Sequence, residues 1–246
     1  MAKSRCRDVH GGTCTQLVES PSYWCSFPGH NRGEVWVHGK VAASLQRMAK
    51  RGGGPFEETS VKAGIRGERA VERYLIRVFE KDPAVHIFSD RGVPGFTVNI
   101  DFVVVKGRSV LMIDAKYWGP GTYWSFPGNG VLHKGPNPFQ VFEPANHRAD
   151  NGRWRPPETM NMATERYSAD LAGCGLGEIQ SLILVSPPSR KADSWQGYKM
   201  RHARSGRCPV AVVGNPHTES RLRRWAAHTS ADDQDDILNY FNNQAR

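Results

Sequence analysis

FTVNIDFVVVKGRSVLMIDAK, the stretch from Phe96 to Lys116, carries the clearest structural signal in this chain. Apolar residues run through both halves of the stretch, and Lys106-Gly107-Arg108 separates the halves, which predicts two β-strands joined by a tight turn. Because successive residues of a strand point to opposite faces, Asp114 and Lys116 must share a face. We therefore expect a β-hairpin at the centre of the fold.

The position of Asp101 depends on the length of the hairpin loop, because directly opposed residues of an antiparallel pair lie on the same side of the sheet. A two-residue loop would set Asp101 opposite Met112. A four-residue loop, Lys106 to Ser109, would set it opposite Asp114. Either register, or a bulge with the same effect, puts two carboxylates and an ammonium on one side of the hairpin.

Three charges among β-branched neighbours lose much of their hydration, and this loss destabilises the fold unless something compensates for it. A divalent cation compensates for two carboxylates. Asp101 and Asp114 offer the hard oxygen ligands that suit Mg²⁺ or Mn²⁺. The hairpin therefore predicts a metal site at these two residues.

The composition is that of a globular protein with a net positive charge. With 246 residues, 39% of them hydrophobic and 10% aromatic, the chain can bury a sizeable core as one domain with an appended terminal segment. No apolar run approaches membrane-spanning length, and no apolar stretch follows the basic residues of MAKSRCRDVHGG, so we expect a cytoplasmic protein that does not enter a membrane. The formal charge of +9 favours a polyanion, with nucleic acid before an anionic membrane surface.

Residues 1 to 54 form a separate, basic part of the sequence. They hold eight Lys or Arg against three Asp or Glu, a net of +5, and are rich in Gly, Ser and isolated aromatic residues. We expect an irregular N-terminal extension with one short strand at Val35 to Val37 and one short helix at Val41 to Met48. Gly52-Gly53-Gly54-Pro55 reads as a linker, so the folded domain is expected over residues 55–246.

The extension also holds a set of cysteines and histidines that could ligate zinc: Cys6, His10, Cys14, Cys25 and His30. Their spacings match no compact zinc finger, and the CxxC pattern is missing. A structural zinc and reduced thiols in a loosely ordered arm both remain open.

A helix is predicted from Ser60 to Glu80 by apolar residues at helical spacing. Glu68 projects from the edge of its core-facing stripe. The helix alone favours a boundary carboxylate that reaches solvent or pairs with Arg69 or Arg73. Gly67, just before it, would let another backbone approach closely.

The remaining elements follow from periodicity and end signals. We expect strands at Ala84 to Phe88, Ile179 to Val185 and Pro209 to Val213, a helix from Pro157 to Leu171 ended by Gly173, a helix capped by Thr218, and a last helix that begins in Asp232 to Asp236. Cys174 and Cys208 are expected to be core thiols.

The motifs GERAVERYL, NIDFVVV and MIDAKYW, in this order, resemble the nuclease-related (NERD) domain, a branch of the PD-(D/E)XK nuclease superfamily. NPFQ, from Asn137 to Gln140, is similar to the Asn-Pro-x-x-Gln segment that opens a helix in that family. The resemblance spans about Gly64 to Val185. It implies an α/β, restriction-endonuclease-like core with a central mixed β-sheet flanked by helices.

The chain departs from the family pattern at two places. Asp-Ala-Lys, ending at Lys116, stands where Glu-x-Lys is commoner, which shortens the reach of the carboxylate by one methylene and keeps its charge. Pro144 falls inside the helix that Asn137 should cap, so that helix is expected to be kinked or short.

The resemblance implies a metal-dependent nuclease that hydrolyses phosphodiester bonds in DNA, with RNA as an alternative substrate. Asp101 and Asp114 would hold Mg²⁺ or Mn²⁺, the backbone carbonyl of Ala115 would join them, and Glu68 would bind the ion directly or through water.

Two further residues complete the expected catalytic set. Lys116 would orient the attacking water and offset charge on the transition state. Gln140 would hydrogen-bond Lys116 or the phosphate. Two other functions stay open: a non-catalytic nucleic-acid-binding descendant of the fold, and a structural or assembly protein of a phage or mobile element. The oligomeric state is open as well.

Overall fold

The structure of this chain is a computed structural model. It describes residues 3–5, 17–19, 35–43, 45–46, 55–96, 98–125, 132–134, 141–143, 147–148, 154–155, 159–188, 194–205, 208–231 and 234–244. All five candidate zinc ligands of the N-terminal extension lie outside these residues, and so does Gln140.

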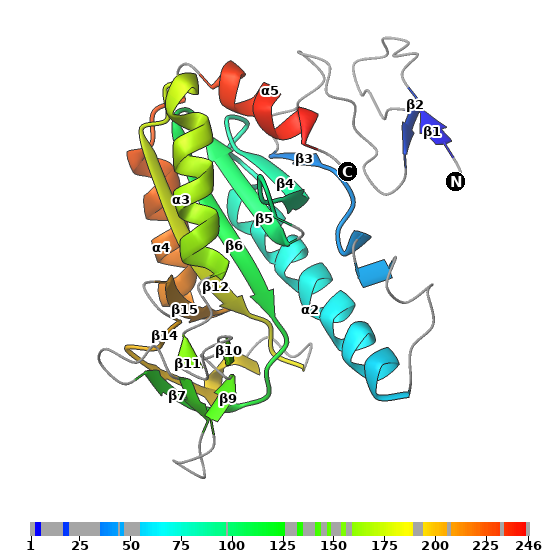
Figure 1. Ribbon diagram of the computed structural model, residues 1–246, viewed down its shortest axis with the longest axis vertical. Coiled ribbons are helices and arrows are strands. Elements are labelled where there is room, and N and C mark those ends of the chain that lie inside the picture. Colours follow the sequence, from blue (N-terminus) through cyan, green and yellow to red (C-terminus); the bar gives the residue numbers. More distant parts are fainter. Residues whose placement is uncertain are drawn as a thin grey trace.

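A seven-stranded sheet forms the centre of the molecule, in the order β14-β15-β12-β6-β5-β4-β3 (Figure 1). Its strands are β3 (Trp36–His38), β4 (His86–Gly92), β5 (Asn99–Lys106), β6 (Ser109–Lys116), β12 (Glu178–Val185), β14 (Arg204–Ser205) and β15 (Cys208–Val212). The neighbours β4, β5 and β6 are antiparallel, whereas β12 runs parallel to both β6 and β15. The sheet is therefore mixed, as predicted.

The predicted hairpin is β5 and β6. Pairing extends to Lys106 with Ser109, so the loop has only two residues. Gly107 is the first of them and has a φ of +51°, a conformation that glycine adopts without strain.

This pairing settles the register that the sequence left open. The last backbone pair joins Phe102 to Ile113, and Asp101 and Asp114 follow it on their strands. The observed register therefore sets Asp101 opposite Asp114. This register was expected with a four-residue loop, whereas the observed loop has two residues.

Helices cover both faces of the sheet. On one face, α2 (Pro55–Phe79) and α4 (Pro216–His228) share an apolar cluster with the inner residues Phe102 and Val104. On the other face, α3 (Thr159–Leu171) and α5 (Asp235–Asn243) pack over Val103 and Val105. Both strands of the hairpin are therefore buried on both faces, which explains their near-continuous apolar sequence.

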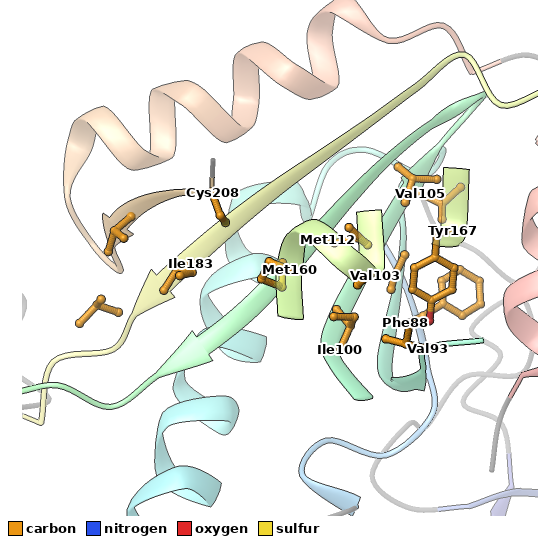
Figure 2. Packing of buried hydrophobic residues seen from close by; sticks show 14 of the residues in the cluster. Phe88, Val93, Ile100, Val103, Val105, Met112, Met160, Tyr167, Ile183 and Cys208 are labelled. Atoms are coloured by element: carbon orange, nitrogen blue, oxygen red, sulfur yellow. The ribbon is translucent and has the colours of Figure 1, made fainter. Parts of the chain in front are cut away.

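Figure 2 shows the packing between the sheet and α3. Met160 and Tyr167 of this helix lie over residues of the central strands such as Met112 and Phe88. The Tyr167 hydroxyl, which is fully buried, donates a hydrogen bond of 2.7 Å to the Gly92 carbonyl oxygen. Among the helices that the structure describes, none combines the length and apolarity needed to cross a membrane.

Part of the N-terminal extension belongs to this core. The strand predicted at Val35 to Val37 forms one residue later, as β3, and pairs in parallel with β4. Val41 and Ala42 behind it are buried, and residues 43, 45 and 46 are helical, in agreement with the helix predicted there. The boundary at residue 54 stays a prediction.

Two histidines join β3 to β4. A ring N–H of one donates to a ring nitrogen of the other, with 3.0 Å between Nε2 of His38 and Nδ1 of His86. Burial lowers the pKa of His38 to about 3 and the pKa of His86 to about 4. Both rings are therefore neutral at pH 7, which leaves one of them a bare ring nitrogen to accept this hydrogen bond.

A second, four-stranded sheet has the order β13-β7-β8-β9 and lies beyond the ends of β6 and β12 (Figure 1). Its strands are β7 (Gly121–Ser125), β8 (Leu132–Lys134), β9 (Val141–Glu143) and β13 (Tyr198–Arg201). Two-stranded pairs join β1 (Lys3–Arg5) to β2 (Leu17–Glu19) and β10 (His147–Arg148) to β11 (Trp154–Arg155), and short 3-10 turns cover Ala172–Cys174 and Ser194–Gly197.

Several sequence predictions need correction. The helix expected after Asn137 is wrong at Val141–Glu143, which form β9; β-branched and aromatic residues there, followed by Pro144, favour a strand. The strand predicted to end at Phe88 continues to Gly92. Gly175, with a φ of +72°, follows the 3-10 turn after α3, so Gly173 does not end that helix.

The other elements agree with prediction within a few residues. The helix predicted from Ser60 begins earlier, at Pro55, because proline fits the first helical position. Cys208 is fully buried and Cys174 partly buried, and both are free thiols as expected. The last helix carries Asp235 and Asp236 in its first turn, where they complement the helix dipole.

The cap of α4 was assigned to the wrong residue. Thr218 lies inside the helix and is buried, whereas the Asn215 side-chain oxygen accepts the backbone N–H of His217 at 2.9 Å. Pro216 occupies the first turn, which fits this starting point.

We predict that Asn215→Ala lowers the free energy of unfolding by about 1 kcal/mol, because an N–H at the helix start loses its acceptor. Urea denaturation measures the change. Asn242→Ala, an exposed position in α5, serves as the control and should change stability by less than about 0.5 kcal/mol. Equal effects of the two substitutions would contradict the cap.

Candidate active site

Asp114 and Lys116 lie on one side of β6, at its carboxyl end. Lys116 Nζ is 3.0 Å from Asp114 Oδ2, an ion pair that confirms the shared face. The side chain of Lys116 is 31% exposed and that of Asp114 is 23% exposed, so solvent and a substrate can reach both. Alternation along a strand was sufficient to predict this part of the site.

Asp101 reaches across from β5. Its Oδ2 accepts the backbone N–H of Ala115 at 2.7 Å, so its carboxylate lies against the backbone between Asp114 and Lys116. Burial raises the pKa of Asp101 well above its ordinary value of 3.8, and the nearby Asp114 and Glu68 raise it further, whereas the Ala115 N–H and Lys116 oppose the rise. The Asp101 carboxyl therefore keeps its proton to higher pH than an ordinary aspartate.

Glu68 comes to this site from α2. It is only 5% exposed, so the interpretation of Glu68 as a carboxylate that reaches solvent is wrong. Burial, then Asp90 and Asp114, raise the pKa of Glu68 to about 7, against a hydrogen bond from the Ala42 backbone. The burial follows from close packing. A Cβ added at Gly67 would lie 3.0 Å from the Cβ of Tyr117, just after β6, which confirms the close approach predicted for this glycine.

Asp90 is a fourth carboxylate that the sequence did not reveal. It stands on β4 between Ser89, paired with Phe102, and Arg91, paired with Ile100, and so occupies the position across from Asp101. Asp90 has a φ of +57°, and the Asn99 side chain donates to its Oδ1 at 2.7 Å. Aspartate tolerates this left-handed backbone conformation better than most residues. The sequence signal for Asp90 was a polar residue just after the strand that was predicted to end at Phe88.

A row of carboxylates thus crosses three neighbouring strands, with Asp90 on β4, Asp101 on β5 and Asp114 on β6, and Glu68 approaches it from α2. Over the described ranges, no three His, Cys, Asp or Glu side chains are already arranged around one point as a metal cage. Gln140 lies outside those ranges, so its predicted place beside Lys116 stays a prediction.

The donor set nevertheless fits a hard divalent cation. Asp101 and Asp114 supply carboxylate oxygens from adjacent strands, and the Ala115 carbonyl lies between Asp114 and Lys116. Mg²⁺ is commonly held by one or two carboxylates and keeps several waters, so it does not need a third side chain. The hydrogen bond from the Ala115 N–H to Asp101 Oδ2 supports the fit, because it holds the Asp101 carboxylate next to Asp114 and leaves its second oxygen for a cation.

We predict that Glu68 contributes a downward slope to the free energy of unfolding, measured without divalent ions, between about pH 4.5 and about pH 7, against the upward slope that the lowered pKa values of His38 and His86 contribute. Glu68 has a pKa of about 7 in the folded protein and an ordinary value of 4.5, so between these pH values the folded state keeps a proton that the unfolded state has lost. Glu68→Gln should reduce this slope and stabilise the protein above pH 7, by up to about 3 kcal/mol.

Urea denaturation across this pH range in EDTA tests the prediction. Glu165→Gln, at an exposed position of α3, is the control and should leave the slope unchanged. A Glu68→Gln protein with the wild-type slope would show that Glu68 is already ionised at neutral pH in the fold.

Comparison with known proteins agrees with the motifs. Residues 63–150 match the family model of the nuclease-related domain. No curated protein and no solved structure matches the chain. All four motifs that carry the resemblance lie inside the matched segment, which ends before β12. The match indicates a nuclease-related function with nucleic acid as the class of substrate. The chain thus contains a segment, residues 63–150, that matches the nuclease-related domain, in an α/β fold consistent with a restriction-endonuclease-like core, as the sequence predicted.

Proposed function

We propose that this protein is a metal-dependent nuclease that hydrolyses phosphodiester bonds in DNA. One observation carries the proposal: Asp101 and Asp114 stand opposite each other at the end of the hairpin, with Lys116 beside them and Glu68 buried behind them. Each buried charge lowers the stability of the fold, so a group of charged side chains in a core is typical of a functional site.

Asp101, Asp114 and the Ala115 carbonyl would hold Mg²⁺ or Mn²⁺, and Glu68 would bind it directly or through a water. The cation would polarise the phosphate and make a water nucleophilic at neutral pH. The Ala115 N–H, by binding Asp101 Oδ2, leaves the other carboxylate oxygen of Asp101 for this purpose.

Lys116 has a different task. Its ammonium lies on the side of β6 that carries Asp114 and is partly exposed, so it can donate to an attacking water and to the phosphate oxygens at once. Both contacts would strengthen as negative charge builds on the phosphate in the transition state, and this would lower the activation free energy of cleavage. Gln140 would orient Lys116 or the phosphate by a hydrogen bond.

One observation favours a rival function. The 3.0 Å ion pair of Lys116 with Asp114 is also what a purely charge-balancing lysine would make. On that interpretation the protein is a non-catalytic nucleic-acid-binding or assembly protein that retains the fold. The two functions differ in what the loss of Lys116 or Asp114 does to cleavage.

A cleavage assay tests the proposed function. Labelled single-stranded, duplex and branched DNAs and RNAs are incubated with the protein in Mg²⁺ or Mn²⁺, with EDTA as the control. We expect DNA cleavage that EDTA stops and that Asp114→Asn abolishes, because the ligand charge is lost. Cleavage that persists in purified Asp114→Asn protein would end the assignment.

We further predict that Lys116→Ala lowers the single-turnover cleavage rate by about 100-fold or more, in line with the loss of a group that acts in the transition state. DNA affinity in Ca²⁺ should change little. Quenched-flow kinetics and a binding titration measure the two quantities, and Lys81→Ala, at an exposed position after α2, is the control. A variant that melts lower but cleaves at the wild-type rate would favour the rival function.

A further inference from the structure

The outer side of α2 carries an unusual line of positive charge. Its basic residues are Lys62, Arg66, Arg69, Arg73 and Arg77, and all five are exposed. They follow one another at intervals of four, three, four and four residues, so they lie in one narrow band along the helix. The band, here called the α2 basic stripe, extends about 22 Å at a rise of about 1.5 Å per residue.

Such a stripe is unfavourable for the helix by itself. Like charges four residues apart repel each other, and the stripe contains three such pairs, of which Arg69 with Arg73 is the central one. Carboxylates offset part of the repulsion. Glu72 flanks the stripe, where the charges of Arg73 and Arg69 oppose the rise that burial causes in its pKa. Oε2 of Glu219, on α4, lies 3.9 Å from Nη2 of Arg77.

The stripe also has little apolar character. Between residues 61 and 79, the one aromatic residue before the last turn is Tyr74, which is buried on the core side. Recognition of single-stranded nucleic acid relies on aromatic side chains that stack on bases, and the stripe offers none. Five exposed cations on a rigid rod instead match the regularly spaced phosphates of a duplex.

We propose that the α2 basic stripe binds the phosphate backbone of duplex DNA at a place separate from the catalytic carboxylates. The choice of DNA rests on the proposed function, whereas the stripe itself does not. Glu68 is turned away from the middle of the stripe by roughly 140° around the helix axis, since each residue adds about 100°. The stripe therefore holds the duplex and does not touch the phosphate that is cut.

Binding of a short fluorescein-labelled DNA duplex in EDTA tests the proposal without any cleavage. Arg69→Gln/Arg73→Gln should weaken binding about tenfold and should reduce the slope of log affinity against log salt by about 1.8, because each lost phosphate contact removes about 0.9. Arg69→Lys/Arg73→Lys keeps both charges and should keep the wild-type slope. Circular dichroism confirms that α2 is still folded in both variants.

The matched control removes two charges elsewhere. Arg108 lies in the β5–β6 loop and Arg166 on α3, both exposed and off the stripe, so Arg108→Gln/Arg166→Gln should leave the slope unchanged. An equal loss of slope in this control would overturn the proposal, because binding would then follow net charge alone. A wild-type slope in Arg69→Gln/Arg73→Gln would overturn it as well, and so would stripe-dependent binding to phosphatidylserine vesicles with unchanged duplex affinity.

Failure of the stripe and failure of the proposed function give different results. If the protein is a nuclease that does not use the stripe, Arg69→Gln/Arg73→Gln cleaves and binds like wild type. If the protein binds duplex DNA through the stripe but is not a nuclease, the slope changes while no metal ion supports cleavage. With both proposals correct, the variant cleaves at the wild-type single-turnover rate once the duplex is saturating.

Discussion

The hydrogen bond from the Ala115 N–H to Asp101 Oδ2 ties together the open end of the central hairpin. Backbone pairing between β5 and β6 ends at Phe102 with Ile113, and beyond it a carboxylate takes the place of a backbone carbonyl. A negative charge is thereby fixed against the strand that carries Asp114. Each of the two strands is also held by its other neighbour, β5 by β4 and β6 by β12, but between β5 and β6 this side-chain contact takes over where the backbone pairs end.

The surrounding fold stabilises an arrangement that is unfavourable locally. Burial and mutual repulsion raise the pKa values of Glu68 and Asp101. Around them, the hairpin is covered on both faces, and residues such as Val103 and Val104 are fully buried. Dense apolar packing next to a group of carboxylates is the combination expected where a protein gives up local stability for a chemical site.

The sequence predicted those parts of the fold that depend on local periodicity. Alternation was enough to predict the hairpin and the shared face of Asp114 and Lys116, whereas for the position of Asp101 it left open two hairpin registers and a bulge. Asp90 was missed because its left-handed backbone, held by Asn99, hides its strand position from an alternation rule. The burial of Glu68 was missed because periodicity places it only at the edge of a stripe.

The errors after β6 have a related cause. Val141–Glu143 were expected in a helix because family motifs were extended through a segment whose own residues favour a strand. The cap of α4 was assigned to Thr218, although Asn215 followed by Pro216 is a sequence pattern typical of a helix start. In both cases the deciding signal is local, in the residues of the segment itself, and it outweighs the pattern that was used to predict the element.

The short strand β3 has a consequence for how the protein can be divided. It covers one edge of the sheet by pairing with β4, and the chain just after it supplies the Ala42 backbone group that binds Glu68. A fragment that begins at α2 would lose both, and would expose the N–H and C=O groups of β4 along an apolar strand. Open edges of this kind pair with other chains, so such a fragment would tend to aggregate. We therefore expect that a fragment which is to fold stably has to include Trp36 to Ala42, which precede the predicted linker.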